Sequence, residues 1–331
     1  MRRIAILTAG ADSPGQNATI RAVARNAFQY SYEVLGVKSG FKGLLKEDIF
    51  IMDRGTVSGI LPLGGTILGT SVGNPFQEKE NIEYLKQIMH KFSITALVVI
   101  GGFSYMKIAS QLDKEDIPVI GIPATIDNDI PFTDKTIGFT SAIEFVAHSL
   151  DRLHSTASSH HRVFLVEVMG GGTGWIGLMG GLSGGADLIL IPEKTYNLEE
   201  IYQHIESRQS SGKEFSIIVA CEEVMPPMEN HSYSSKKCDI IDYLYDNICS
   251  NCAFEVRKLV LGHLQRGGAP TVSDRILATQ LGVEAVEMLK RGEVGKMSSI
   301  YQGKLCGIDL SKIEERKKVD VEMLDIAKLF Y

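Results

Sequence analysis

The sequence lacks the features that mark membrane proteins and nucleic-acid-binding proteins. No uninterrupted apolar run reaches the roughly 18 residues that a membrane-spanning helix needs. The formal net charge is −6, which excludes the broad positive surface that general nucleic-acid binding requires. We therefore expect neither a membrane nor a nucleic acid as a partner.

Cysteine is also scarce, with five residues scattered over a chain of 331. Cys249 and Cys252 have the spacing of a metal-binding pair, but neither a second pair nor histidines at ligand spacing stand nearby. With Cys221, Cys238 and Cys306 they form an odd, dispersed set, which favours structural or incidental thiols. Such usage is typical of a reducing compartment, so we expect a cytoplasmic protein.

What the chain does contain is an alternation of apolar strand-like stretches with helix-like stretches. RRIAILT (residues 2–8), ALVVIGG (96–102) and RVFLVEVMG (162–170) are predicted strands, and residues 80–92 place their apolar side chains on one helical face. Alternation of this kind indicates parallel sheets covered on both faces. Two such series predict an α/β fold of two doubly wound domains with mainly parallel sheets and a cleft between them.

Glycine-rich turns follow several of these strands. LTAGADSPGQNA (7–18) leads into a helix and suits an anion at the helix N-terminus, although a simple tight turn is an equal alternative. In LVVIGGFS (97–104) two glycines end a strand, as in loops that let a phosphate approach the backbone. Phe103 and Ser104 follow these glycines, at the point where phosphate chemistry normally needs a carboxylate to hold a metal ion.

Two polar motifs carry the clearest chemistry. Asp127 and Asp129 in PATIDND follow an apolar strand, so one carboxylate can accept a hydroxyl proton while the other binds a metal or a partner. His263 and Arg266 in LGHLQRGG follow another strand and are suited to grip a phosphate. The alternatives are an Asp-rich turn for the first motif and a solvated basic face for the second.

Taken in order, these stretches resemble the 6-phosphofructokinase family, and the family order extends over about residues 2–300. TIDND together with GHLQRGG is the most specific part of the match. The resemblance implies two Rossmann-like domains, a homotetramer as the usual bacterial assembly, and transfer of a phosphoryl group to fructose 6-phosphate with Mg²⁺ and ATP. It implies a donor-side, nucleotide-type domain of residues 1–138 plus about 264–304, and a sugar-phosphate-side domain of residues 139–263 plus about 305–331.

The sugar-phosphate side of the family pattern is kept almost completely. The resemblance implies that Asp127 is the catalytic base, with Thr125 and Asp129 beside it. The family's sugar-phosphate contacts match Arg162, Met169, Gly170, Glu223, Arg257, His263 and Arg266. Of these, Arg162 and Arg257 match arginines that reach in from a neighbouring subunit.

The donor side of the pattern is broken. GGFS replaces the family's GGDGS, so the metal-holding acid is missing and the loop is one residue shorter. The pyrophosphate-dependent relatives carry GGDD and a lysine before TIDND, and this chain has neither. Asp129 remains as a possible metal ligand, and Asp12 or Ser104 are alternatives that could hold Mg²⁺ indirectly. The degenerate donor-side positions are Ala11, Val72, Phe103, Ser104, Ala124 and Gly171, where the family has glycines, arginines or the metal-binding motif.

A second set of cations matches part of the family's effector pocket, which lies between subunits and takes phosphorylated effectors. Arg21 and Arg25 are four residues apart and share a helical face, and Arg54 and Lys213 complete the match. His154 stands where the family often has an arginine, as does Ser211, so the effector is left open. Ordinary surface charge is the alternative.

Three hypotheses follow. In the first, the chain binds fructose 6-phosphate or a related sugar phosphate but transfers phosphate from ATP weakly or not at all. It would then serve as a regulatory subunit, as a homotetramer or in a hetero-oligomer with an active phosphofructokinase. Loss of a metal ligand and two cations should lower the rate by roughly three decades or more. The second is an active 6-phosphofructokinase of glycolysis with a rearranged metal site and an unusual donor, and the third is another sugar phosphate or reaction.

Overall fold

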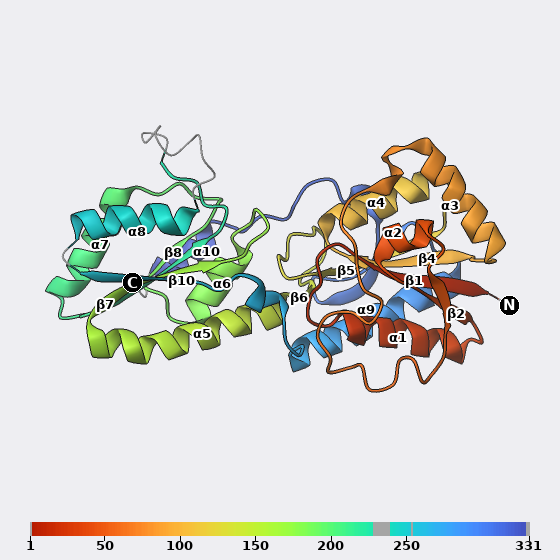
Figure 1. Ribbon diagram of the computed structural model, residues 1–331, viewed down its shortest axis with the longest axis horizontal. Helices are drawn as coiled ribbons and strands as arrows, with labels where there is room; N and C mark the ends of the chain where they lie inside the picture. Colours follow the sequence, from red (N-terminus) through yellow and green to blue (C-terminus); the bar gives the residue numbers. More distant parts are fainter. Residues whose placement is uncertain (1, 228–238, 253, 329–331) are drawn as a thin grey trace. The chain divides into compact units, whose positions relative to one another are not determined.

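The computed structural model describes residues 2–227, 239–252 and 254–328, which form two compact units. Unit 1 comprises Met1–Ser141 and Arg266–Arg316, and unit 2 comprises Ala142–Gln265 and Lys317–Tyr331 (Figure 1). The last boundary therefore falls after Arg316, whereas the sequence placed it near residue 304. The reason is that residues 304–309 pair with a strand of unit 1 and stay with its sheet.

Unit 1 is built on one eight-stranded sheet whose centre is parallel. Its two edge pairs, β2 with β3 and β11 with β12, are antiparallel. The strands lie in the order β12 (Lys304–Asp309), β11 (Lys296–Tyr301), β5 (Val119–Thr125), β4 (Ala96–Gly101), β1 (Arg3–Ala9), β2 (Glu33–Val37) and β3 (Ile49–Met52), while β6 (Ile137–Gly138) pairs with β5. The carboxyl ends of β1, β4 and β5 consequently meet at one edge.

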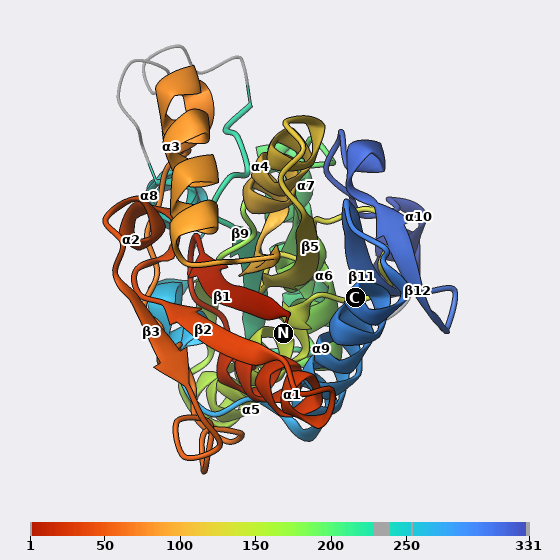
Figure 2. The same cartoon turned by 90° about the vertical axis from the view of Figure 1, so that its right-hand side faces the viewer.

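Helices cover both faces of this sheet. Helices α1 (Gln16–Gln29) and α9 (Val272–Arg291) pack together on one face, and α2 (Gly40–Leu45), α3 (Lys79–Lys91) and α4 (Phe103–Lys114) lie on the other (Figure 2). Alternate strand residues therefore enter two separate cores, which is why these strands are apolar throughout.

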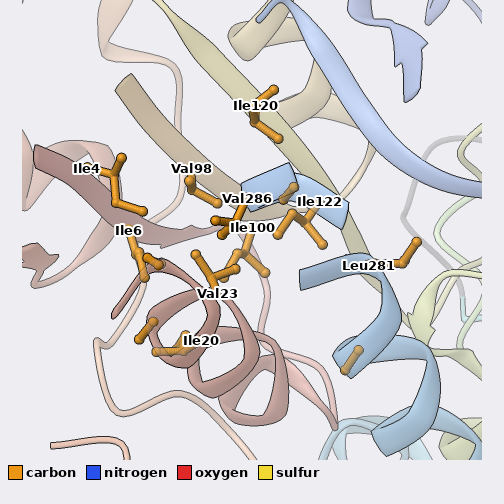
Figure 3. Close-up of a cluster of buried hydrophobic side chains, with 14 of the residues drawn as sticks. Ile4, Ile6, Ile20, Val23, Val98, Ile100, Ile120, Ile122, Leu281 and Val286 are labelled. Carbon is orange, nitrogen blue, oxygen red and sulfur yellow. The ribbon is translucent and has the colours of Figure 1, made fainter. Parts of the chain in front are cut away.

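Figure 3 shows the core beneath α1 and α9. Ile4 and Ile6 of β1 lie on the side of Val23 of α1, together with Leu281 and Val286 of α9. The intervening residues, Ala5 and Leu7, belong to the core on the opposite face, with Phe41 of α2, Leu85 of α3 and Met106 of α4.

Unit 2 has a four-stranded, wholly parallel sheet in the order β10 (Glu255–Val260), β7 (Arg162–Val168), β9 (Ser216–Cys221) and β8 (Leu188–Leu190). Figure 1 shows α5 (Phe139–His160) on the opposite side of this sheet from α7 (Leu198–Ser210) and α8 (Ile240–Asn251). Helix α6 (Trp175–Ser183) packs on β8 and β9, and α10 (Glu322–Lys328) packs on α6. Among the described residues, the short 3₁₀ helices are η1 (Pro75–Gln77), η3 (Gly262–Arg266) and η4 (Leu310–Lys312).

Within the described part of the chain, no helix is long and apolar enough to cross a membrane. Cys221, Cys249, Cys252 and Cys306 are free thiols, and Cys238 lies outside the described residues. Burial raises the pKa of the Cys221 thiol far above its usual range. That thiol is therefore a protonated, apolar core group.

Candidate active site

The predicted catalytic residues come together where β5 ends. Thr125 is the last residue of the strand, and its hydroxyl lies 3.2 Å from Oδ2 of Asp127 and accepts the Asp127 backbone N–H at 3.2 Å. The chain then turns through Asn128, whose φ of 51° is one that asparagine tolerates well. The Asn128 side chain holds the turn by accepting the N–H of Thr136 at 3.0 Å.

Arg266, from the other end of the sequence, reaches the same place. One of its terminal nitrogens lies 4.0 Å from Oδ1 of Asp127, and both side chains are largely buried. It also donates to the backbone carbonyl of Asp12 at 3.5 Å. An acid and a guanidinium so placed can take a proton and balance anionic charge beside it.

A small hollow of about 110 Å³ opens beside these residues, and we call it the β5 hollow. It lies within unit 1 and joins the predicted catalytic residues to three degenerate donor-side positions. Its lining consists of Ala11, Gly102, Phe103, Ser104, Tyr105, Thr125, Asp127, Asp129 and Arg316.

Arg316 is a residue of this hollow that sequence reasoning missed. It forms an ion pair with Asp129, whose residue is only 1% exposed. Its guanidinium carbon lies 5.2 Å from the centre of the Phe103 ring, within the range of a cation–π contact. No motif marks Arg316, which stands in the charged run KIEERKK (312–318).

The residues around the β5 hollow do not fit a divalent cation held by protein carboxylates. Phe103, which the resemblance aligns with the family's metal-binding acid, lines this hollow with its ring, and Asp129 is paired with Arg316. Among the residues that the structure describes, no three or more histidines, cysteines, aspartates or glutamates form a metal-binding group. Phe103 also begins α4, so its backbone is fixed by the helix.

The remaining donor-side positions lie apart from this hollow. Ala124 is buried within β5, and Gly171 adopts a φ of 60° in the loop after β7. Val72 is 81% exposed and lines a separate hollow of about 350 Å³ in unit 1. Tyr105 lines the β5 hollow, and Gly73 lines the hollow that contains Val72. The Tyr105 hydroxyl connects the two by accepting the N–H of Gly73 at 3.2 Å.

In unit 2, the Gln265 side chain positions the segment of Met169 and Gly170, which the sequence assigns to the sugar-phosphate side. This buried glutamine accepts the Met169 N–H at 3.3 Å and donates to the Gly262 carbonyl at 3.0 Å. A Cβ at position 170 would lie 2.3 Å from the backbone carbonyl oxygen of Thr173 and 3.3 Å from a carboxylate oxygen of Glu223, so the close approach of the Thr173 backbone requires glycine there. Gln265 lies inside the motif GHLQRGG, although we did not single it out from the sequence.

His263 is exposed in η3, the short helix that follows β10. The role of His263 in holding a sugar phosphate stays a prediction.

Arg162 and Arg257 share one acid. Arg162 begins β7 and is paired in register with Glu255 of β10, whose carboxylate accepts its Nε–H at 2.6 Å. Arg257 forms an ion pair with the same carboxylate. The hydrogen bond from Arg162, followed by the charges of both arginines, lowers the pKa of Glu255. The two arginines therefore lie together near the edge of this sheet. Their extension into the site of a neighbouring subunit stays a prediction.

The effector-site candidates are divided between the two units. Arg21 and Arg25 lie on α1, and the guanidinium carbon of Arg54 lies 5.9 Å from the ring centre of Phe28 on the same helix. Lys213 lies in unit 2, at the rim of a different hollow.

That hollow of unit 2 has a volume of about 410 Å³ and a polar lining that includes His154, His204, Ser211 and Lys213. Its floor contains an ion pair between Arg208 and Asp187 at 2.7 Å. Burial raises the pKa of Asp187, an effect that the Ile217 N–H and the Arg208 charge oppose, and burial lowers the pKa of His204.

The structure is that of an α/β protein with two doubly wound units, in which a carboxylate and a guanidinium meet at the end of β5. A family model described as phosphofructokinase matches residues 3–289, and the chain belongs to the phosphofructokinase family. This confirms the resemblance and the predicted fold of two Rossmann-like domains.

The relatives of the chain include enzymes named for two donors. The chain is 39% identical to the pyrophosphate–fructose 6-phosphate 1-phosphotransferase of Dictyoglomus thermophilum, over 99% of this chain and 98% of that protein. It is 41% identical to the ATP-dependent 6-phosphofructokinase of Spirochaeta thermophila, over 99% of this chain and 96% of that protein.

A solved structure of phosphofructokinase from Saccharomyces cerevisiae superimposes with a TM-score of 0.84 and 30% identity. The match covers 95% of this chain and 45% of the yeast chain. The pyrophosphate-dependent phosphofructokinase of Nitrosospira multiformis has a TM-score of 0.86 at 21% identity, covering 96% of this chain and 86% of that one, and shows the fold alone.

Proposed function

We propose that the chain is a phosphotransferase that phosphorylates fructose 6-phosphate or a closely related sugar phosphate, in glycolysis, with Asp127 as the base. The observation that carries this proposal is the contact of Asp127 with Thr125 and the nearby Arg266 at the end of β5. Relatives of about 40% identity, one named a fructose 6-phosphate phosphotransferase and one a 6-phosphofructokinase, support the same acceptor.

The proposed step is a displacement at the terminal phosphorus of the donor. Asp127 accepts the proton of the C1 hydroxyl, and the hydroxyl oxygen forms a bond to that phosphorus. The bond between the phosphorus and the leaving phosphate oxygen breaks, and its electron pair departs with the leaving group. Thr125 orients Asp127, while Arg266 balances the negative charge that gathers beside it.

The donor end differs from what Mg²⁺ and ATP require in the family. Phe103 stands in the place of the metal-binding acid, and the remaining acid, Asp129, is paired with Arg316. We therefore propose that transfer from magnesium-bound ATP is slow, and that the preferred donor is an unusual one.

A second candidate function is that of a regulatory protein that binds the sugar phosphate without turnover. Ala11 and Phe103, which replace a phosphate-loop glycine and the acid, both line the β5 hollow and favour this candidate. In this form the chain assembles with an active phosphofructokinase, or as a homotetramer whose Arg162 and Arg257 complete a neighbour's site. The cationic residues Arg21 and Lys213 then belong to an effector site, and the protein acts in the cytoplasm.

A coupled assay for fructose 1,6-bisphosphate, run with ATP, GTP and pyrophosphate, separates the two functions. Calorimetry with fructose 6-phosphate is run in parallel, and an Asp127→Asn variant provides the background rate. Product above that background with at least one donor supports the phosphotransferase. Binding of fructose 6-phosphate without product supports the regulatory protein, and absence of both contradicts both.

A further inference from the structure

The donor end of the site carries a cation of the chain itself. Arg316 is the last residue of unit 1 and lines the β5 hollow together with Thr125 and Asp127. It is fixed on two sides, by the ion pair with the buried carboxylate of Asp129 and by the ring of Phe103 at 5.2 Å. An arginine held by an acid and an aromatic ring is preorganised, so it loses little freedom when it binds an anion.

The Arg316 guanidinium is accessible to solvent as well as paired with Asp129. The Arg316 side chain is 39% exposed, whereas that of Asp129 is 2% exposed, so the arginine also faces solvent. The same group can therefore neutralise the buried acid and meet an anion in the hollow.

The two acids of the hollow would otherwise repel a phosphate. Asp129 is neutralised by Arg316, and Asp127 has Arg266 at 4.0 Å. The hollow of about 110 Å³ is also lined by residues of the first turn of α4, a helix of 12 residues whose positive dipole end lies there. Its small volume suits a single phosphate group better than a nucleoside.

We infer that Arg316 is a built-in phosphate-binding cation, which supplies at the donor end the positive charge that a metal ion held by an acid would supply elsewhere in the family. The ligand class is a small phosphate anion, either inorganic pyrophosphate or the terminal phosphate of a nucleotide, bound without a divalent metal. This inference rests on the proposed phosphotransferase function, because it assigns the donor end of that site.

The test is calorimetry of the full chain with inorganic pyrophosphate in the presence of EDTA, and separately with metal-free ATP. We expect pyrophosphate to bind without metal, and Arg316→Met to weaken binding by roughly 10- to 100-fold, the value of charge-assisted hydrogen bonds. Tighter binding of pyrophosphate than of ATP identifies the free anion as the ligand, and the reverse order identifies a nucleotide phosphate; either order supports the inference.

Lys107→Met is the matched control. Lys107 lies 5.7 Å from the same Phe103 ring, but it contacts the Glu314 carbonyl and does not line the hollow. We expect this variant to bind pyrophosphate as the wild type does.

A double variant distinguishes two reasons why Arg316→Met could weaken phosphate binding. Either Arg316 contacts the phosphate directly, or its loss leaves the negative charge of Asp129 unpaired beside the phosphate. Arg316→Met alone uncovers the charge of Asp129, whereas Asp129→Asn with Arg316→Met removes both charges and spares the fold. If Arg316 binds the phosphate, the double variant stays as weak as the single one. Recovery of binding in the double variant, unchanged binding in Arg316→Met, or binding that requires Mg²⁺ would each overturn the inference.

The same experiment distinguishes this inference from the proposed function. Metal-free binding that depends on Arg316 stands even if no fructose 1,6-bisphosphate forms. Conversely, turnover that requires Mg²⁺ and is indifferent to Arg316 would leave the proposed function intact and remove the inference.

Discussion

Arg316 and Asp129 form an ion pair across 187 positions of the sequence, at the end of β5. The acid is almost fully buried, whereas the arginine is partly exposed to water. The charge of Asp129 is therefore stabilised mainly by Arg316, while the charge of Arg316 is also stabilised by solvent. Removal of one member of such a pair leaves a buried charge, whereas removal of both does not. This asymmetry gives the first prediction.

We expect Arg316→Met to lower the free energy of unfolding by about 2–4 kcal/mol, a value reduced for the exposure of the arginine. The double variant with Asp129→Asn should recover most of that loss. Urea denaturation of the wild type and the two variants measures both effects. A double variant less stable than the single one would show that Asp129 is held by groups other than Arg316.

A second prediction concerns Gln265, which ties Met169 to Gly262 in unit 2. Gln265→Met fills a similar volume but leaves a buried N–H and a carbonyl without their partner, at a cost of about 2–3 kcal/mol. Because Met169 and Gly170 then lose their support, affinity for fructose 6-phosphate should also fall.

Gln203→Met is the matched control, since Gln203 is exposed on α7. Urea denaturation and calorimetry of both variants check the prediction. Equal stability of the two variants would mean that the Gln265 hydrogen bonds contribute little to the fold.

A third prediction concerns pH. Burial, aided by the charge of Arg208 and opposed by Asp187, lowers the pKa of His204 below the ordinary value of 6.5. The unfolded chain therefore binds a proton at this residue at a higher pH than the folded chain does. The contribution of neutral His204 to stability is complete above about pH 6.5 and declines as the pH falls through the lower folded pKa.

Urea denaturation between pH 5 and 8 measures this effect, and a His204→Gln variant should flatten the decline on the acidic side. His160→Gln is the control, because His160 is exposed at the end of α5. The same acid slope in His204→Gln and in the wild type would assign the decline to other groups.

Much of the fold could be predicted from the sequence, because strands buried on both faces must be apolar throughout. β1, β4, β5 and β7 are such strands, and all were predicted. The edge strands β3 and β12 were not. They are partly exposed, and β3 has only four residues, so neither forms a long apolar run. Their antiparallel pairing depends on the neighbouring strand rather than on local pattern.

The candidate site was predictable where its residues lie in one motif. Thr125 ends β5, Asp127 and Asp129 follow it directly, and the motif TIDND groups all three. Arg316 was beyond prediction, because its partner is distant in sequence and the charged run around it is typical of a solvated surface. The sequence motif does not show that Asp129 pairs with an arginine rather than with a metal ion. Only the long-range contact with Arg316 shows it.

The central claim is that Asp127 removes the proton of the sugar hydroxyl. The direct test is the initial rate of fructose 1,6-bisphosphate formation by wild type and Asp127→Asn, with the best donor and with fructose 6-phosphate saturation verified by calorimetry. The account predicts that Asp127→Asn binds the sugar phosphate but forms product roughly 100-fold or more slowly, the usual contribution of a general base. Equal rates in the two proteins, or no product from the wild type with any donor, would contradict it.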